Sequence, residues 1–426
     1  MLDIKRIREQ PDLVRKTIET KHGDPVLDEV IEKDLTRRAI IGRAEVLKNK
    51  RNTVSEEVAR RKRAKETTDD VIAEMKVVSD EITSLDSTLR DLEAGLQLLL
   101  DGIPNILHSS VPEGVDAAGN VEVKRQAPND EAHWWEKKEG LDHLALGEKY
   151  QLFDFKRGAK IAAGGFPVYT GRGAALERAL INFMLDLHAH SHGYSEVMPP
   201  LFVNAASLRG TGQLPKFADQ AYYMPEDQLY AIPTAEVPIT NLHADEILTR
   251  DMLPIKYCGF SACFRREAGS YGKDTRGFLR VHEFNKVELV KFAHPETSYD
   301  EHESLTRDAE RVLELLEIPY RRLLLCSGDT GFGSAKTYDL EVWAPIEGKF
   351  LEASSCSNYE DFQARRANIR FREEPKSKPE FVHTLNGSAL ATSRLMVALL
   401  ENYQQPDGTI KMPEALQPYL RFSVIE

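Results

Sequence analysis

Cysteine is scarce in this 426-residue sequence, and the long hydrophobic runs of membrane-spanning proteins are missing. The four cysteines form no CxxC pair and no zinc-binding pattern with histidine, so we expect reduced thiols and no bound zinc. No segment reaches about 18 uninterrupted apolar residues, and the N-terminus is charged from its third residue. The sequence therefore predicts neither a signal peptide nor a membrane span, and we expect a cytoplasmic protein without a membrane partner.

The common sequence motifs of nucleotide and hydrolytic sites are also missing. There is no GxxxxGK[ST] phosphate loop, no GxGxxG, no GxSxG and no HExxH. Any bound nucleotide must therefore be held by another scaffold. The net charge of −12 excludes a surface that is basic throughout, so contact with a nucleic acid would require a local basic region.

Residues 27 to about 101 are predicted to form a long helical hairpin. The apolar positions of its second half alternate in steps of four and three, which is typical of a coiled-coil seam. The first half has a weaker version of the seam, with Arg51 at a position that should be apolar, and the polar turn KETTDD separates the halves. Two helices joined by so short a turn must run antiparallel, each roughly 50 to 60 Å long, and we expect them to project as an arm. The seam positions are Val71, Met75, Val78, Ile82, Leu85, Leu89, Leu92, Leu96 and Leu99.

The predicted tip of this arm is basic. Residues 48–65 contain eight Lys or Arg against two Glu, a local balance of +6 in an acidic protein. A charged run on a helix is often only a solvated face, but on a projecting arm phosphate contact is the better interpretation. The candidate cations are Lys48, Arg51, Arg60, Arg61 and Arg63.

A domain boundary is predicted in the segment LDGIPNILHSSVPEG, residues 100–114, which has two prolines and two glycines. We place the N-terminal domain at residues 1–110 and the second domain at 111–426. Short strand-like runs, glycine turns and amphipathic helices follow the boundary, which favours an α+β domain built on an antiparallel sheet flanked by helices.

The most informative segment is residues 264–288, FRREAGSYGKDTRGFLRVHEFNKVE, predicted as a β-hairpin around a loop with three glycines and several cations. Side chains alternate along a strand, so Arg265 and Glu267 share one face of the first run, and Phe284 and Glu288 share one face of the second. A guanidinium suits a phosphate, an aromatic ring suits a base, and carboxylates suit an amine. The pattern indicates a nucleotide and amino-acid site, against the plainer alternative of a salt-bridged solvent face.

This segment resembles motif 2 of the class II aminoacyl-tRNA synthetases, and in detail that of the seryl-tRNA synthetase family. The string LERALINFMLDLHAHSHGYSEVMPP (176–200) resembles motif 1, which forms much of the dimer interface in that class. LNGSALATSRLMVALLENYQ (385–404) resembles motif 3, a strand and turn leading into a helix with Arg394. IPTAEV (232–237), LEASSCSN (351–358) and TLNGSALA (384–391) are similar to strings of the seryl family, and their order and spacing extend the resemblance over essentially the whole chain.

The resemblance implies an N-terminal tRNA-binding domain followed by a class II catalytic domain. It implies a homodimeric ligase that activates L-serine with ATP and Mg²⁺ and transfers the serine to tRNA(Ser), and it leaves open whether tRNA(Sec) is a second substrate. An enzyme that loads a small amino acid onto a carrier protein is one alternative, although such relatives are expected to lack the arm. The other is a non-catalytic RNA-binding paralogue, in which decay should first have removed the residues that bind the substrates.

The resemblance also implies roles for individual residues. Arg265 would hold the α-phosphate, Arg394 the γ-phosphate, and these two with Glu352 would be catalytic. Glu267 would bind the adenine amino group, Phe284 would stack on adenine, and Glu352 with Ser355 would bind Mg²⁺. Strand alternation turns Arg266 away from the site. The serine set is Thr234, Ala235, Glu236, Glu288 and Ser388, and the ATP set is Arg265, Arg266, Glu267, Val281, Phe284, Glu352, Ala353, Ser354, Ser355 and Arg394.

Overall fold

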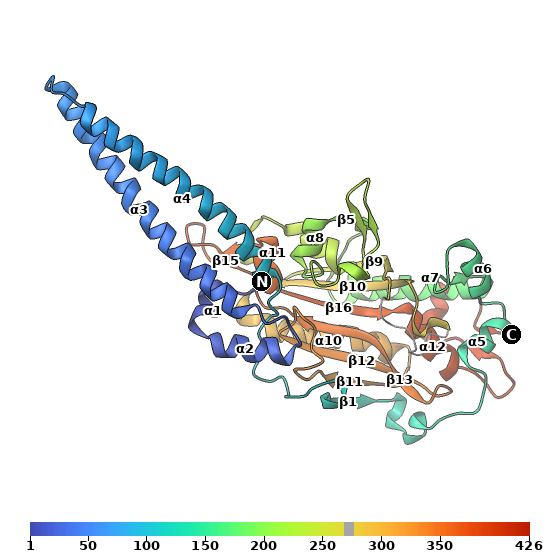
Figure 1. Cartoon of the computed structure of the whole chain (residues 1–426). Helices are drawn as coiled ribbons and strands as arrows, with labels where there is room; N and C mark the ends of the chain where they lie inside the picture. Colours follow the sequence, from blue (N-terminus) through green and yellow to red (C-terminus); the bar gives the residue numbers. More distant parts are fainter. Residues whose placement is uncertain (268–276) are drawn as a thin grey trace. The chain divides into compact units, whose positions relative to one another are not determined.

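The computed structural model describes residues 1–267 and 277–426, with the side chains of Asp70 and Asp130 left aside. The chain forms two compact units (Figure 1), one of residues 2–104 and one of residues 105–426 that also includes Met1. The division falls inside the proline- and glycine-containing segment 100–114. No helix among the described residues combines the length and the apolar character needed to cross a bilayer.

The N-terminal unit is entirely helical. Two short helices, α1 (Ile4–Glu9) and α2 (Pro11–Thr20), precede the long helices α3 (Leu27–Arg63) and α4 (Asp69–Asp101). Pro11 is the first residue of α2, where its missing N–H is not needed. The helices α3 and α4 lie side by side and antiparallel (Figure 1), which confirms the predicted hairpin. Together, α3 and α4 form the arm.

The predicted coiled-coil seam is confirmed in the arm. Leu47 of α3 packs with the buried Val78 and Ile82 of α4, and Met75 and Leu85 extend this contact. Burying these side chains stabilises the pair, because a two-helix hairpin has no other core. Ion pairs between the two helices flank the seam, and they join Arg37 to Glu93 (3.0 Å), Arg43 to Glu81 (2.9 Å) and Lys48 to Asp86 (3.0 Å).

The second unit is built on an eight-stranded sheet whose neighbours all pair antiparallel except β4 and β9, which run parallel. This confirms the predicted α+β class. In spatial order the strands are β1 (Val121–Gln126), β11 (Tyr320–Leu324), β12 (Lys336–Ala344), β13 (Lys349–Asn358), β16 (His383–Ala391), β10 (Glu283–Ala293), β9 (Ile255–Phe264) and β4 (Ser195–Glu196).

Three helices pack on this sheet and share its main hydrophobic core: α7 (Gly171–Asp186), α10 (Ser298–Leu315) and α12 (Thr392–Asn402). The helix expected in the motif 1 segment is α7, which continues into a π-helical turn before β4. In the motif 3 segment β16 passes directly into α12, because Ala391 ends the strand and Thr392 begins the helix. The turn expected between them is therefore absent.

Shorter elements complete this unit. The short helices are α5 (His143–Lys149), α6 (Phe155–Ile161), α8 (Ala205–Gly210), α9 (Glu236–Thr240), α11 (Phe362–Ala367) and the 3₁₀ turn η8 (Gly277–Leu279). The small sheets contain β2 (Phe153–Asp154) with β3 (Val168–Tyr169), β5 (Phe202–Asn204) with β7 (Leu229–Ala231) and β6 (Tyr223–Met224), β15 (Glu380–Phe381) with β14 (Arg370–Arg372) and β8 (Ile247–Thr249), and β17 (Ile410–Lys411) with β18 (Val424–Ile425).

Candidate active site

The two strands of the predicted hairpin are β9 and β10, which pair antiparallel along their whole length. The glycine-containing loop between them lies outside the described residues from 268 to 276. Arg265 and Glu267 are not strand residues, contrary to the prediction, since β9 ends at Phe264. The backbone N–H of Arg265 still bonds to His282, but that of Arg266 donates to the carbonyl of Gln220, so the chain leaves the hairpin there.

Pairing of β10 with β16 places Glu288 opposite Ser388 in the centre of the sheet. The register shifts at this point, and Leu390 has a φ of 121°, a value that non-glycine residues rarely adopt. Bulges and unusual backbone angles are frequent at functional sites, where they redirect a side chain at a cost in stability. The distortion lies where β16 approaches α12 and Arg394.

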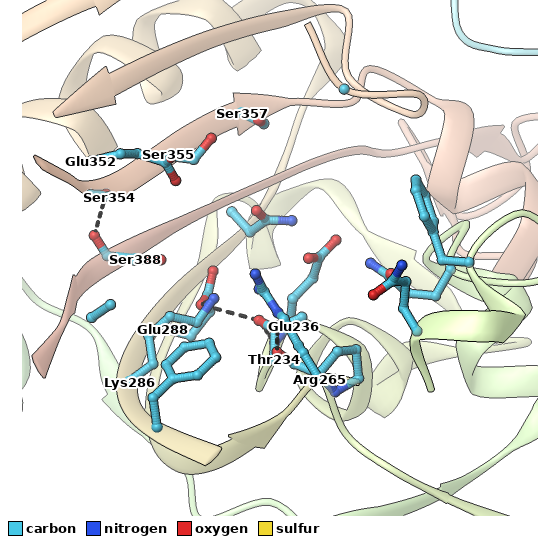
Figure 2. A pocket seen from close by; sticks show the side chains of 18 of the residues that line it. Thr234, Glu236, Arg265, Lys286, Glu288, Glu352, Ser354, Ser355, Ser357 and Ser388 are labelled. Carbon is cyan, nitrogen blue, oxygen red and sulfur yellow. Dashed lines mark hydrogen bonds and ion pairs between the residues drawn. The ribbon is translucent and has the colours of Figure 1, made fainter. Parts of the chain in front are cut away.

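A cavity of about 660 Å³ opens over these strands (Figure 2), and it brings together most of the residues predicted from the sequence. Residues from β10, β13, β16 and α12, and from the segment that follows β9, converge on it, although they lie far apart in the chain. The predicted residues that line it are Thr234, Glu236, Glu288, Ser388, Arg265, Glu267, Val281, Phe284, Glu352, Ala353, Ser354, Ser355 and Arg394.

Two predicted residues do not line this cavity. Ala235 is fully buried in a separate apolar cluster with Ile239 and Val290. Arg266 lies where the chain has left β9; its Nε donates to the carbonyl of Ala221 (2.9 Å), and its guanidinium lies 4.8 Å from the ring centre of Tyr222. Neither side chain therefore faces this cavity, and the position of Arg266 agrees with its predicted outward direction.

Part of the cavity wall is a buried network of polar side chains (Figure 2). The Thr234 hydroxyl donates to Glu288 Oε2 (3.2 Å) and accepts from the Glu236 backbone N–H (3.2 Å). Glu288 also forms a close ion pair with Lys286, and both side chains are almost completely excluded from solvent. Pairing is required here, because an isolated charge is costly to bury. The arrangement offers carboxylates and a hydroxyl to a small polar ligand.

Glu236 is the second carboxylate of this network. Burial, and then the nearby negative charge of Glu288, raise the pKa of its carboxyl to about 7. The Gln363 amide donates to Glu236 Oε1 (2.7 Å) and holds the side chain in place. A bound cation would favour the ionised form, so this carboxyl is suited to an ammonium group.

Two arginines that line the same cavity already have acceptors. The Arg265 guanidinium lies 5.2 Å from the ring centre of Phe284, and its Nε donates to the Pro233 carbonyl (3.3 Å). Arg394 Nη1 donates to the backbone carbonyl of Glu352 (2.6 Å) and lies 3.5 Å from its Oε1. These contacts hold two guanidinium groups beside one cavity, a distribution that suits phosphate groups.

Strand β13 provides an acidic region next to Arg394. Ser355 lies opposite Asp339 of β12, and Glu352 lies two pairs away, beyond a register shift. Burial, and then the charge of Glu352, raise the pKa of Asp339 well above its usual range. Asp339 Oδ1 is buried without a hydrogen bond. Oxygen ligands with one unsatisfied carboxylate fit a hard cation such as Mg²⁺.

Sequence reasoning missed several residues of the cavity wall. Lys286 could have been found, because it lies two residues before Glu288 on β10 and alternation gives both the same face. Arg280, which pairs with Glu267 at 3.2 Å, follows η8 and had no periodic signal. The other missed polar residues come from separate loops and strands that only the fold brings together: Thr211, Gln213, Gln220, Ser334, Ser357, Tyr359, Asn386 and Ser393.

The antiparallel sheet with its cavity between β10, β13, β16 and α12 defines a class II aminoacyl-tRNA synthetase core. The family model described as tRNA synthetase class II core domain (G, H, P, S and T) matches residues 222–403, and that of the seryl-tRNA synthetase N-terminal domain matches residues 1–107. The chain belongs to the serine–tRNA ligase family, also called seryl-tRNA synthetases.

Relatives along the full length support this membership. The serine–tRNA ligase of Chloroherpeton thalassium is 61% identical, with 100% of both chains covered, and that of Prosthecochloris aestuarii is 56% identical, with 100% of this chain and 99% of the relative covered. The crystal structure of seryl-tRNA synthetase from Pyrococcus horikoshii complexed with ATP has a TM-score of 0.92 and 38% identity, and the match covers 100% of this chain and 99% of that one.

The Lys286–Glu288 pair yields a stability prediction. Lys286→Met should destabilise the protein by about 3 kcal/mol, because it leaves the Glu288 carboxylate buried without its cation. The double variant Lys286→Met/Glu288→Gln should recover at least half of that loss. Thermal unfolding of the full chain, followed by calorimetry, measures both, and a double variant no more stable than the single one would contradict the assignment.

Proposed function

We propose that this protein activates L-serine with ATP to form seryl-adenylate and then transfers the serine to the 3′ end of tRNA(Ser). The main support is one cavity that is lined both by a network of carboxylates and a hydroxyl and by two arginines. The names of the relatives and the ATP complex of the Pyrococcus horikoshii structure support the same reaction.

In the first step a serine carboxylate oxygen attacks the α-phosphorus of ATP, and the bond to the β-phosphate oxygen breaks to release pyrophosphate. Both reactants are anionic, so the reaction needs positive charge where negative charge develops, and a general base is not required. Arg265 binds the α-phosphate and orients it toward the serine. Arg394 binds the γ-phosphate, exchanging its contacts with Glu352 for contacts with the nucleotide.

Glu352 and Ser355 would hold Mg²⁺, with Asp339 behind them as a buried carboxyl. When bound, the ion neutralises phosphate charge and favours the departure of pyrophosphate. Phe284 provides an aromatic face for adenine, and Glu267, held by Arg280, accepts from its amino group.

Serine is held by the carboxylate and hydroxyl side chains of the same cavity. Glu236 and Glu288 bind its α-ammonium group, while Thr234 and Ser388 provide hydroxyl groups for its polar atoms. Alanine would leave one of these buried polar groups without a partner, so a site of this kind rejects it strongly. Threonine must be excluded by the shape of the pocket.

Exchange of pyrophosphate into ATP without tRNA tests the activation step. We expect exchange with serine but not with alanine, glycine, threonine or cysteine. Arg265→Ala should lower kcat by about 100- to 1000-fold with a smaller change in the KM for serine, because its charge acts mainly in the transition state. Arg266→Ala removes a neighbouring arginine that does not line the cavity, and it serves as the control.

Other outcomes of the same assay favour the alternatives. Exchange with alanine or glycine in place of serine would indicate an enzyme that loads a carrier protein. An absence of exchange with all five amino acids would indicate a non-catalytic paralogue.

The raised pKa of Glu236 predicts a pH dependence of serine binding. Glu236 is mostly ionised at pH 8 and mostly protonated at pH 6, since its pKa is about 7. The KM for serine should therefore rise about tenfold from pH 8 to pH 6, because the protonated carboxyl cannot pair with the ammonium group. Glu236→Gln should raise this KM and flatten its pH profile. A wild-type KM that is constant over this range would contradict the role of Glu236.

We also propose that the tip of the arm binds the phosphate backbone of the tRNA. Arg51 and Arg63 are exposed and make no side-chain ion pair among the described residues. Arg60 and Arg61 both donate to Glu57, and they lower the pKa of its carboxyl to about 2. Lys48 is also paired, with Asp86. Arg51 and Arg63 are therefore the better candidates for direct contact with phosphate, because they lose no ion-pair partner when they bind.

The double variant Arg51→Ala/Arg63→Ala should raise the KM for tRNA(Ser) about tenfold at low salt and leave pyrophosphate exchange unchanged, since the lost contacts are with phosphates. The matched control is Lys160→Ala, which removes an exposed cation of α6. Aminoacylation assays measure both and, run with tRNA(Sec), show whether this tRNA is a second substrate. An unchanged KM in the double variant would exclude these contacts.

We further propose a homodimer formed through the motif 1 segment. A second cavity there is lined by side chains of α7, by Met198, which is 89% exposed, and by Phe260. A highly exposed apolar side chain beside a hydrophobic groove indicates that a partner covers this surface. Met198→Asp should convert dimers into monomers in sedimentation equilibrium, and Val115→Asp, at another exposed apolar position, should not. A dimer that survives Met198→Asp would contradict this interface.

A further inference from the structure

We propose that His143, Glu347 and Glu401 bind a divalent transition-metal ion, with Zn²⁺ the best fit, outside the substrate cavity. One ligand atom from each of the three residues lies within 4.8 Å of the others. None of the three lines the cavity that we assign to serine and ATP. The proposed ion is therefore distinct from the Mg²⁺ that Glu352 and Ser355 would hold.

The three residues come from separate parts of the second unit. His143 is the first residue of α5, Glu347 lies in the turn between β12 and β13, and Glu401 lies in the last turn of α12. The helices α5 and α12 contact each other (Figure 1). The side chains of His143 and Glu401 are 1% and 0% exposed, and that of Glu347 is 8% exposed. The group is therefore largely shielded from water.

In each carboxylate, one oxygen is held by other groups and the second oxygen faces His143. Glu401 Oε2 accepts from the backbone N–H groups of Ile346 (2.9 Å) and Glu347 (3.1 Å), whereas its Oε1 has no hydrogen bond. Glu347 Oε2 lies 3.6 Å from Lys349 Nζ, and its Oε1 faces the imidazole. These outer contacts resemble the supporting bonds that orient metal ligands.

The distances favour a metal ion over a shared proton. His143 Nδ1 lies 3.7 Å from Glu347 Oε1 and 3.9 Å from Glu401 Oε1, too far for a hydrogen bond to either, and neither ring nitrogen has a hydrogen-bond partner. Tetrahedral zinc ligands, at bond lengths near 2.0–2.2 Å, are about 3.3 Å apart, so small side-chain shifts would complete the site. A cation would also compensate two buried carboxylates, which is otherwise costly.

The donor set selects the class of metal. One imidazole nitrogen and two carboxylate oxygens suit Zn²⁺ and neighbouring transition metals better than Mg²⁺ or Ca²⁺, which prefer oxygen ligands alone. Three protein ligands would leave a position for water. Our expectation that the protein binds no zinc was based on cysteine spacing, and ligands so far apart in the sequence leave no such pattern.

The proposed ion would position one wall of the substrate cavity. A Cβ atom placed on Gly277 of η8 would lie 2.3 Å from His143 Nε2, so the imidazole packs directly against this turn. The next residue, Phe278, lines the cavity, and its ring centre is 6.4 Å from that of His143. Glu401 belongs to the same helix as Arg394. An ion at this site would therefore hold η8 and α12 together.

Metal analysis and titration of the full-length protein test the proposal. After removal of metals with a chelator, the protein should bind about one equivalent of Zn²⁺ in calorimetric titration, with weaker binding of Mn²⁺ and no binding of Mg²⁺ at this site. Zn²⁺ should raise the Tm. His143→Gln and Glu401→Gln should each weaken binding at least about tenfold. The control His190→Gln removes an exposed histidine, and it should bind as the wild type does.

A second measurement, on the wild-type protein, tests the proposal even if the variants do not fold. Co²⁺ added to the metal-free wild-type protein should give one saturable set of visible absorption bands that Zn²⁺ abolishes. Binding that is equally strong in His143→Gln or Glu401→Gln would overturn the proposal. It would also be overturned if the wild type bound neither Zn²⁺ nor Co²⁺. Pyrophosphate exchange without added Zn²⁺ is measured in parallel, so that failure of the proposed function is distinguished from failure of this site.

Discussion

The candidate site depends on the antiparallel pairing of β10 with β9 on one side and β16 on the other. This pairing places Glu288 between Gly259 and Ser388, and the absence of a side chain at Gly259 leaves room for Ile239 and Val197. A register error of one residue would turn Lys286, Glu288 and Ser388 to the opposite face of the sheet. The apolar residues that alternate with them, such as Val287 and Leu289, are fully buried in the main core. The same burial that stabilises the sheet therefore fixes the orientation of the polar side chains.

Charge pairing before substrate arrives is the second property of this site. Glu288 pairs with Lys286, Glu267 with Arg280 and Glu352 with Arg394. Buried or half-buried charges without partners would destabilise the fold, so each is compensated inside the protein. A substrate with an ammonium group at one end and phosphates at the other can replace these partners with its own charges. The cost of assembling the charged groups is then met during folding and not during the reaction.

Local patterns in the sequence were sufficient to predict the arm, and the resemblance of short motifs predicted part of the cavity lining. The four-and-three spacing from Val71 to Leu99 identified the seam, because a coiled coil repeats one contact many times. Short motifs identified the residues of β10, β13 and α12. Arg265 and Glu267 line the cavity, but the prediction assumed that they alternate along a strand. They follow β9 and are not part of it. The bond from Arg266 to Gln220 that draws the chain away joins residues with no common periodicity. For the same reason Arg280, Asn386 and the group around His143 had no local signal.

The direct passage of β16 into α12 has a consequence for the geometry of the reaction. Ser388 and Arg394, which we propose to contact serine and the γ-phosphate, belong to one uninterrupted segment with no loop between them. Rotation or sliding of this segment would displace both ends together, so their separation varies little with thermal motion. In the proposed reaction this segment would therefore fix the distance between a group that holds the amino acid and a group that holds the triphosphate before either substrate is bound.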